Sequence, residues 1–390
     1  MAADQKLIVR EVHASGYRSL RAIRFPVGRL TVFVGANGAG KTNLYRALQL
    51  LQAAAAGNLA EMLAAEGGMA AAMWAGVRNA KKPARITLAV EFADASDPET
   101  TLYSYEVIAG FPPPLPPGPR GAFPAEPQIK EETLAFHFGR RTIKLLERRG
   151  AAVIGRNPDG KRIDITHDLM ASETALGAFD EPQNFPEVHS IRQTMLDWRF
   201  YHTLRTDTES RMRRPCLAVT SATLAADGSN LAAVLATLVY IRGDTVDLDR
   251  AIDDAFAGAQ LDVPLPGREA SFGMVFPEHP RRVFQADELS DGTLRYLALT
   301  GALLALRLPA FIAFNEPESS LHPDLLEPLA RLIVNASQRT QIWLVTHSER
   351  FADALHRFGG VAVRTVAKKD GETWIEGLML SGSFREDDED

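Results

Sequence analysis

The chain has 390 residues, of which 46% are hydrophobic and 24% are charged, and it carries a formal net charge of −6. This composition is typical of a folded globular protein and excludes a disordered one. The apolar run at 294–308 is interrupted by arginines before it reaches the ~20 residues that span a bilayer, so we expect no membrane contact. The single cysteine, Cys216, excludes an internal disulfide framework and predicts a cytoplasmic protein.

The negative charge is concentrated at the carboxyl end of the chain. Residues 381–390 form a predicted acidic tail, which we expect to be solvated. Basic residues cluster elsewhere, and DNA contact through these clusters stands beside the alternative of an ordinary solvated surface. The three clusters are Arg78, Lys81, Lys82 and Arg85; Arg140, Arg141, Lys144, Arg148 and Arg149; and Arg205, Arg211, Arg213 and Arg214.

Strand and helix signals alternate through the first 56 residues. We predict strands at 7–12 and 21–25, on either side of the turn Gly16-Tyr17-Arg18-Ser19. The apolar, β-branched run 30–34 predicts a buried strand, and a helix is expected from about Thr42 to Ala56.

Between that strand and that helix the chain reads V-G-A-N-G-A-G-K-T-N-L, a complete phosphate-binding loop. Its glycines let successive backbone N–H groups turn inward around phosphate oxygens, and the following helix directs its positive dipole end at the anion. Lys41 is expected to reach the β- and γ-phosphates, and the Thr42 hydroxyl to ligate Mg²⁺. The predicted nucleotide-binding residues of the loop are Gly35, Asn37, Gly38, Gly40, Lys41, Thr42 and Asn43.

The middle of the chain shows no comparable motif. An alanine-rich stretch at 53–75 is broken by glycines into short helices, and a Pro-rich loop at 111–127 can form neither sheet nor helix. A mostly helical pattern is expected at 172–199 and a helix at 230–242. Apolar runs predict strands at 85–92, 102–108, 133–138, 142–147 and 152–154.

The last hundred residues return to strand–helix alternation. The apolar runs 310–314 and 341–346 are of the buried parallel type, with a helix at 323–337 between them, and two strands are expected at 361–366 and 373–378. Three polar clusters lie at strand ends or at a helix start, where open α/β sheets bind ligands. They are Leu289-Ser290-Asp291-Gly292-Thr293, Asn315-Glu316-Pro317-Glu318 with Leu321-His322-Pro323, and Thr346-His347-Ser348.

In this order, and with Gly16–Leu20 ahead of the phosphate loop, these motifs resemble the ABC-type ATPase heads of the RecF/SMC-like group. They are closer still to the predicted RecF-like ATPases that carry an AAA-21 domain. The resemblance implies an α/β fold: a P-loop NTPase ABC-ATPase head with a mixed β-sheet, N-terminal antiparallel strands and an inserted α/β lobe. The implied domains are an ATPase core at 1–52 and 280–380 and an inserted lobe at 53–279.

The resemblance also implies roles for single residues. Glu316 matches the carboxylate that polarises the attacking water, and His347 matches the switch histidine at the γ-phosphate. Ser290 and Gly292 match the element that caps the nucleotide of a second subunit, which makes ATP the link in a homodimer. The alternative for this element is a helix N-cap turn. Catalysis at such a site, with ATP and Mg²⁺ bound, depends on positioning and charge neutralisation.

Two features depart from the family pattern. Asn315 stands where most such ATPases carry an aspartate that assists Mg²⁺ through its water shell. An amide can still hydrogen-bond a metal-bound water but brings no negative charge, so weaker Mg²⁺ binding and slow turnover are expected. The glutamine of the Q-loop stays open among Gln128, Gln183 and Gln193.

The leading functional hypothesis is an ATP-hydrolysing, ATP-gated dimer that acts on DNA in double-strand break repair or genome maintenance. The second hypothesis is an ATPase sensor of a phage-defence or toxin–antitoxin system that controls a separate effector protein. A transporter ATPase is disfavoured by the Gly16–Leu20 element and by the large insertion.

Overall fold

The computed structural model describes residues 6–77, 83–113, 123, 125–165, 169–179, 181–202 and 204–385. The chain packs into two compact units. Unit 1 comprises Met1–Gly28, Gly35–Trp198 and Arg364–Asp390, and unit 2 comprises Arg29–Val34 and Arg199–Val363. This division into two units reflects which residues pack together in the structure. The division into a core at 1–52 and 280–380 and a lobe at 53–279 follows motifs, and it stays a prediction.

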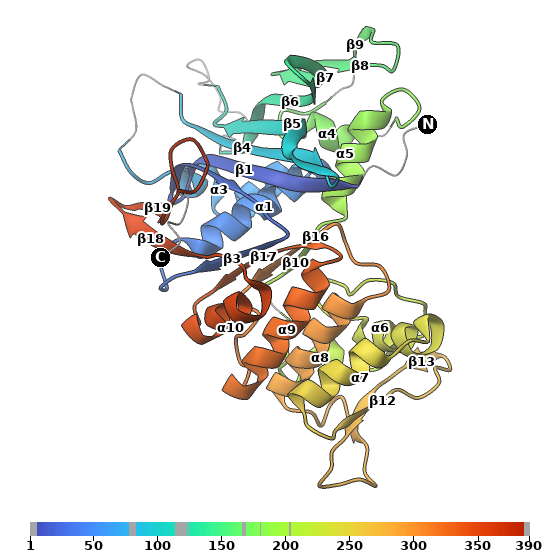
Figure 1. Cartoon of the computed structure of the whole chain (residues 1–390). Helices are drawn as coiled ribbons and strands as arrows, with labels where there is room; N and C mark the ends of the chain where they lie inside the picture. Colours follow the sequence, from blue (N-terminus) through green and yellow to red (C-terminus); the bar gives the residue numbers. More distant parts are fainter. Residues whose placement is uncertain are drawn as a thin grey trace. The chain divides into compact units, whose positions relative to one another are not determined.

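Unit 1 is built on an eight-stranded antiparallel sheet with the order β2-β1-β4-β5-β6-β7-β8-β9 (Figure 1). Alternate residues of each strand point to one face, and in β4 those residues are the buried Ile86, Leu88, Val90 and Phe92. The strands predicted for this region are confirmed. Their bounds are β1 Leu7–Tyr17, β2 Leu20–Pro26, β4 Arg85–Asp94, β5 Asp97–Gly110, β6 Gln128–Phe138, β7 Arg141–Arg149 and β8 Ala152–Arg156. The sheet ends in a further strand that was not predicted, β9 Arg162–Asp164.

The apolar face of this sheet packs on α1 (Lys41–Ala56), the helix that follows the phosphate loop (Figure 1). The helix α5 (Pro186–Leu196) contacts α1, and Gln52 Nε2 donates to the Trp198 carbonyl at 2.8 Å. The remaining elements of unit 1 are α2 Leu59–Ala65, α3 Gly68–Ala72 and α4 Ala175–Ala178, with the hairpin of β18 Val363–Lys369 and β19 Glu372–Ile375.

The mostly helical pattern expected at 172–199 is only partly confirmed. Two helices form, α4 and α5, but the segment Arg199–Tyr201 is a strand, β10, and belongs to unit 2. Two of its three residues are aromatic, which suits a half-buried pleated strand better than a helix. A strand this short gives too little pattern to be detected from sequence.

Unit 2 contains four parallel strands in the order β10-β16-β17-β3. The strands β16 (Phe311–Asn315) and β17 (Gln341–Thr346) are buried along their whole length, as expected for parallel strands covered by helices. The other strands are β3 Leu30–Val34, β11 Cys216–Leu217, β12 Gln260–Asp262, β13 Glu269–Ala270, β14 Gly273–Val275 and β15 Phe284–Gln285. The helices are η1 Arg211–Arg213, α6 Leu231–Thr237, the π-helix η2 Leu238–Arg242, α7 Val246–Ala255, α8 Asp291–Leu304, η3 Pro323–Leu325, α9 Leu326–Ser337 and α10 Glu349–Gly359.

Some sequence predictions fall outside the described residues. These are Arg78, Lys81 and Lys82 of the first basic cluster, most of the Pro-rich loop, and the last five residues of the acidic tail. Among the residues that the structure does describe, no helix is both long and apolar enough to cross a membrane.

Candidate nucleotide site

The carboxyl ends of the four parallel strands of unit 2 are aligned at one edge of the sheet. The paired residues at this edge are Tyr201 with Phe314, Asn315 with Val345, and Thr346 with Val34. The residues that follow each strand therefore leave the sheet side by side, where open α/β sheets place their ligands. From β3 the chain continues at Gly35 directly into the phosphate loop.

The backbone of the phosphate loop, in unit 1, has the shape that its glycines allow. Gly38 (φ 82°) and Gly40 (φ 101°) both lie in the left-handed region, which L-residues rarely adopt. Gly40 is the N-cap of α1, so the helix begins at Lys41 rather than at Thr42. Asn37 and Thr42 are exposed.

Two hydroxyl groups brace the loop, and sequence reasoning assigned a role to neither of them. Thr373 Oγ1, from β19, donates to the Ala39 carbonyl (3.0 Å) and lies 2.6 Å from Ser19 Oγ. Asn43 Nδ2 donates to the same Ser19 Oγ (2.6 Å). A side chain at Gly40 would collide with both hydroxyls. Ser19 lies in the turn that the family resemblance singled out, whereas the sequence around Thr373 gives no signal.

Lys41 is folded back onto the loop. Its side chain is buried, and Nζ donates to the carbonyl of Gly35 and to that of Ala36 (3.0 Å). A buried ammonium group needs acceptors of this kind, and anionic phosphate oxygens are stronger acceptors than backbone carbonyls. The loop thus holds a charged donor that a triphosphate can recruit.

In unit 2 the structure brings Glu316 and His347 together. His347 Nδ1 lies 3.7 Å from Glu316 Oε2, and both side chains are partly exposed. Glu316 has φ 52°, a left-handed conformation that costs a non-glycine residue about 1–3 kcal/mol. Its N–H donates to the Val345 carbonyl at 2.9 Å. Glu316 follows the last residue of β16 directly, and its carboxylate lies next to the imidazole.

Glu318 lies behind this pair, and sequence reasoning gave it no role. Its side chain is only 4% exposed, and Oε1 accepts hydrogen bonds from the Thr346 hydroxyl and from the His347 N–H (3.2 Å). His347 Nδ1 lies 3.4 Å from the same oxygen. Glu318 therefore fixes the segment that presents His347. The signal that could have found it is its place two residues after Glu316.

Arg295, on α8, connects the helix to the turn that contains Glu316 and Pro317. This buried side chain donates to the carbonyls of Glu316 (3.3 Å), Pro317 (3.2 Å) and Leu204 (3.3 Å). Burial lowers the pKa of the Arg295 guanidinium, and the negative charge of Glu318 opposes that effect. Arg295 thus connects α8 to three carbonyls of two other segments, and its charge is balanced in part by Glu318.

Ser290 and Gly292 lie at the start of the same helix. Ser290 is the N-cap of α8, and its Oγ accepts a hydrogen bond from the Thr293 N–H at 3.2 Å. This is the N-cap geometry expected as the alternative to a nucleotide-capping role, and the two are compatible because an exposed helix N-terminus attracts anions. At Gly292 a Cβ would lie 3.2 Å from the Ser320 carbonyl, so a larger residue would crowd this turn.

Two arginines of the predicted basic clusters form hydrogen bonds inside the protein and are not available on its surface. Arg213 donates to the Leu289 carbonyl (2.7 Å) and to the Asp291 carboxylate (2.6 Å). Arg148 is buried, and it donates to the Gly150 carbonyl at 2.8 Å. The clusters that can contact phosphate are therefore smaller than the sequence predicted.

Asn315 ends β16 and is only 5% exposed. Its Nδ2 lies 2.6 Å from His202 Nδ1, whereas its Oδ1 has no hydrogen-bond partner among the described residues. A buried acceptor without a partner costs ~1–3 kcal/mol, and a ligand-bound water offsets that cost. Because Mg²⁺ keeps several of its waters when it binds, an oxygen acceptor of this kind fits its outer shell.

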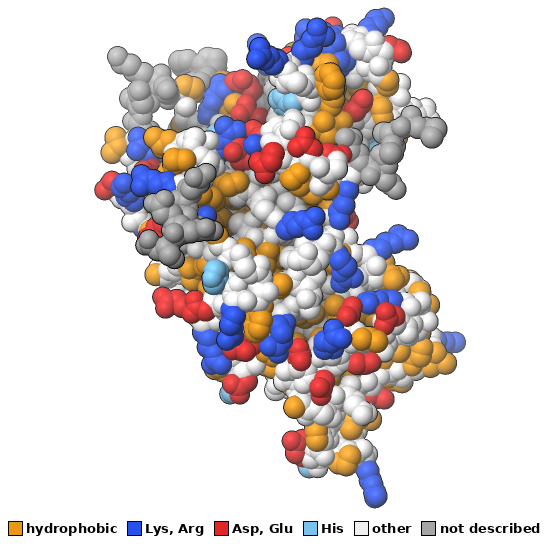
Figure 2. Space-filling view, viewed as in Figure 1, with side chains coloured by type: hydrophobic (Ala, Val, Ile, Leu, Met, Phe, Trp, Pro, Cys, Tyr) orange, Lys and Arg blue, Asp and Glu red, His pale blue; other side chains and the backbone are white. Residues whose placement is uncertain are grey.

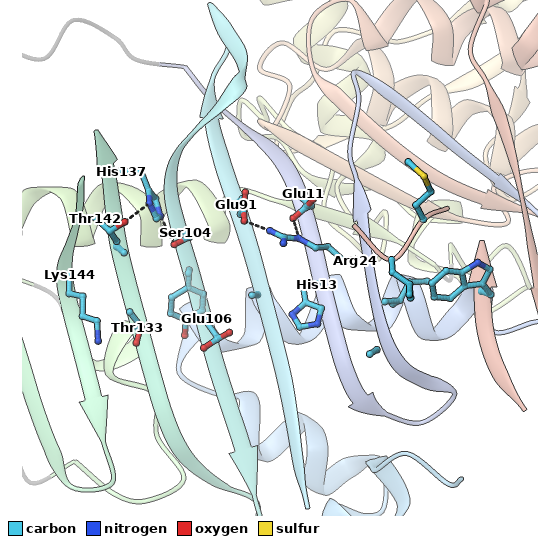
Figure 3. Close-up of a pocket in the computed structure, with 18 residues that line it drawn as sticks. Glu11, His13, Arg24, Glu91, Ser104, Glu106, Thr133, His137, Thr142 and Lys144 are labelled. Atoms are coloured by element: carbon cyan, nitrogen blue, oxygen red, sulfur yellow. Dashed lines mark hydrogen bonds and ion pairs between the residues drawn. The ribbon is translucent and has the colours of Figure 1, made fainter. Parts of the chain in front are cut away.

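A second concavity, on the polar face of the unit 1 sheet, has different chemistry (Figure 3). It has a volume of about 650 Å³, and several of its charges are paired, as between Arg24 and Glu91 (2.6 Å). Ser104 Oγ lies 2.8 Å from His137 Nε2, and the Thr142 hydroxyl contacts the other ring nitrogen. Hydroxyl groups therefore contact both ring nitrogens of His137, an arrangement that lacks the carboxylate which stabilises the imidazolium in a Ser-His-Asp triad.

A family model described as "AAA domain, putative AbiEii toxin, Type IV TA system" matches residues 30–97 and 179–353, which is well over half of the chain. The chain belongs to this AAA-domain family. The matched segments contain the phosphate loop and all three downstream polar clusters, and they also contain His202. The strands β6 to β9 lie outside them. A comparison with curated proteins finds no match.

Solved structures place this member of the AAA-domain family among ABC-type ATPase heads by fold. An Smc head domain with an extended coiled coil, bound to the C-terminal domain of ScpA and derived from Pyrococcus furiosus, has a TM-score of 0.51 at 12% identity and covers 96% of this chain and 97% of its own. An Smc head bound to the C-winged-helix domain of ScpA has a TM-score of 0.50 at 15% identity, with 96% and 98% covered. The predicted fold class and the resemblance to RecF/SMC-like ATPases are confirmed.

Proposed function

We propose that this chain binds and hydrolyses ATP, and that bound nucleotide joins two copies into a dimer. One observation carries the proposal: Asn315, Glu316 and His347 lie at the sheet edge from which the chain continues directly into a complete phosphate loop. Membership of an AAA-type ATPase family supports it.

The residues divide the work as follows. Lys41 exchanges its two carbonyl acceptors for phosphate oxygens, and the α1 N-terminus adds its dipole. Glu316 accepts a hydrogen bond from the attacking water, and His347 contacts the γ-phosphate. Mg²⁺, held by Thr42 and through water by Asn315, would neutralise phosphate charge. Turnover is slow in this proposal, because Asn315 adds no negative charge.

The dimer follows from the second half of the site. Ser290 and Gly292 face the nucleotide of a second copy in this proposal, and the α8 N-terminus adds its dipole. Neither residue is needed to bind ATP in its own copy. Because the site is divided between two copies, the dimer forms only with ATP bound, and hydrolysis of ATP lets the two copies separate.

A Glu316→Gln variant is expected to form a stable dimer in MgATP, whereas wild type dimerises only transiently. The amide no longer polarises the water, but nucleotide binding is kept. Light scattering after size exclusion measures the mass, with MgADP as the nucleotide control. Glu316→Gln carrying Ser290→Arg, which places a bulky side chain at the cap, is expected to stay monomeric while still binding ATP. A monomeric Glu316→Gln at saturating MgATP contradicts the two-copy mechanism.

A DNA-directed role in repair or genome maintenance is the first proposal for the use of this switch. Lysine and arginine side chains gather at the end of unit 1 formed by β7 to β9 (Figure 2). A groove of about 330 Å³ there is lined by Lys144, Arg156 and Arg162, with Glu147 as the acid between them. A hydrogen bond from Lys144 lowers the pKa of Glu147. A local excess of cations can bind phosphates even though the whole chain is acidic.

For this role, the double variant Lys144→Ala/Arg162→Ala is expected to weaken duplex binding and to reduce the slope of log K against log salt by about 1 for each phosphate that is no longer neutralised. Fluorescence anisotropy with a short duplex at several salt concentrations measures both effects. The matched control is Arg250→Ala/Arg281→Ala, which removes the same charge from exposed positions of unit 2. Equal losses of affinity in the two variants show that the groove has no special part in binding.

The family description favours a second candidate, an ATPase that regulates a toxin–antitoxin or phage-defence system through a separate effector protein. The two Smc heads described above are each bound to a domain of ScpA, which supports a protein partner for a head of this fold. Under this candidate, duplex DNA changes neither ATP turnover nor assembly of wild type.

A further inference from the structure

The strand β10 brings a histidine to the site that neither the motifs nor the family resemblance identified. It pairs in parallel with β16, with Tyr201 opposite Phe314. His202 follows Tyr201 directly after β10, and Asn315 follows Phe314 as the last residue of β16. The two side chains meet, with 2.6 Å between His202 Nδ1 and Asn315 Nδ2.

This contact fixes which way the Asn315 amide points. The amide nitrogen can only donate, so Nδ1 of His202 accepts and the ring proton is carried by Nε2. The amide oxygen then points away from the imidazole, and it is the atom that lacks a partner among the described residues. The pair therefore presents a buried acceptor, and not a pair of N–H donors, to the site.

The chain on both sides of His202 is held in place. Tyr201 stacks on Phe314 (centroids 5.5 Å apart), and its hydroxyl donates to the Leu224 carbonyl at 2.9 Å. The Leu204 carbonyl accepts from Arg295 at 3.3 Å, the same guanidinium that holds the Glu316 carbonyl. The residues on either side of His202, Tyr201 and Leu204, are therefore fixed by packing and hydrogen bonds.

We infer that His202 is a positioning residue for Mg²⁺, holding the Asn315 amide so that its oxygen accepts a hydrogen bond from a metal-bound water. The inference rests on the proposed ATPase function. An amide turned the other way would aim two N–H donors at the hydration shell of a cation, where only acceptors are useful. An aspartate at this position has two equivalent oxygens and needs no such partner. The histidine is therefore required only because residue 315 is asparagine.

A double-mutant cycle tests this dependence without measuring hydrolysis. Wild type, His202→Ala, Asn315→Asp and the double variant are titrated with Mg²⁺ at a fixed concentration of a fluorescent, non-hydrolysable ATP analogue. His202→Ala is expected to raise the Mg²⁺ concentration for half-maximal binding about tenfold, because the Asn315 oxygen is no longer held toward the metal-bound water and about one hydrogen bond is lost. Binding of the analogue in EDTA is expected to be unchanged. In the Asn315→Asp background the same substitution is expected to change it less than about twofold.

Two further variants keep the result interpretable. His202→Asn offers an oxygen close to where Nδ1 lies, and it is expected to recover most of the Mg²⁺ affinity. His356→Ala, which removes an exposed histidine of α10, is expected to match wild type. Thermal unfolding shows whether each variant is folded.

The failures of the two proposals are distinguishable. Wild type that binds no nucleotide with or without Mg²⁺ overturns the proposed function. Only the positioning role is overturned if nucleotide binds but its Mg²⁺ dependence ignores His202→Ala, or if this substitution has equal effects in the wild-type and Asn315→Asp backgrounds.

Discussion

Replacing Lys41 by alanine is expected to weaken ATP binding by ~10²–10³-fold, which corresponds to about 3–4 kcal/mol. The substitution removes the only charge placed inside the phosphate loop, where backbone N–H groups and the α1 dipole can compensate for part of the loss. Isothermal titration calorimetry with MgATP measures the affinity directly.

The control for Lys41→Ala is Arg46→Ala, on the same helix. Arg46 is partly exposed and bonds Glu66 at 2.8 Å, away from the loop. The Arg46→Ala substitution removes the same unit of charge. Its effect on the affinity for ATP is expected to stay within about threefold, since a partly exposed, screened charge contributes little. Equal losses of affinity in the two variants indicate a general charge effect and contradict a phosphate-binding role for Lys41.

Arg295→Ala is expected to lower the free energy of unfolding by about 3–5 kcal/mol, the cost of removing one partner from a buried charged network. Three carbonyls lose the guanidinium as a donor, and buried Glu318 loses the favourable charge of Arg295. Urea denaturation followed by tryptophan fluorescence measures this change.

A matched control for that variant is Arg307→Ala, which removes an exposed arginine just after α8. Its effect on unfolding is expected to stay within about 0.5 kcal/mol. ATP hydrolysis by Arg295→Ala is expected to fall as well, because the guanidinium helps to hold Glu316 in its strained conformation. Stability equal to wild type would show that the carbonyls find other donors.

The parts of the fold that could be predicted from sequence carry their signal locally. The strands β3, β16 and β17 are mostly apolar runs. The phosphate loop follows β3, and polar residues follow β16 and β17, which is typical of the edge of a sheet that binds a ligand. The phosphate loop is recognised by its glycines followed by Lys41 and Thr42, between a strand and a helix. Burial, in contrast, is not local: Glu318 sits in a plain acidic stretch, and only the folded chain shows that it is nearly inaccessible.

The parts that could not be predicted depend on register between distant segments. Thr373 reaches the phosphate loop from more than three hundred residues away, and His202 meets Asn315 across a separation of 113 residues. The strand that delivers His202 has three residues and lies at the end of a helical pattern. A single sequence holds no information on such pairings until the sheet order is known.

The contacts of Lys41 have a consequence for how nucleotide enters. The Lys41 ammonium is bonded to two carbonyls of the phosphate loop, and these carbonyl oxygens occupy the position that phosphate oxygens would take. In the proposed ATPase, ATP binds by exchange: a phosphate oxygen displaces a carbonyl oxygen, and the net gain in free energy is the difference between an anionic and a neutral acceptor. Release is the reverse exchange, in which the carbonyls recapture the lysine as the phosphates depart. In the proposed cycle the Lys41 ammonium therefore has an oxygen acceptor both before ATP binds and after the phosphates leave.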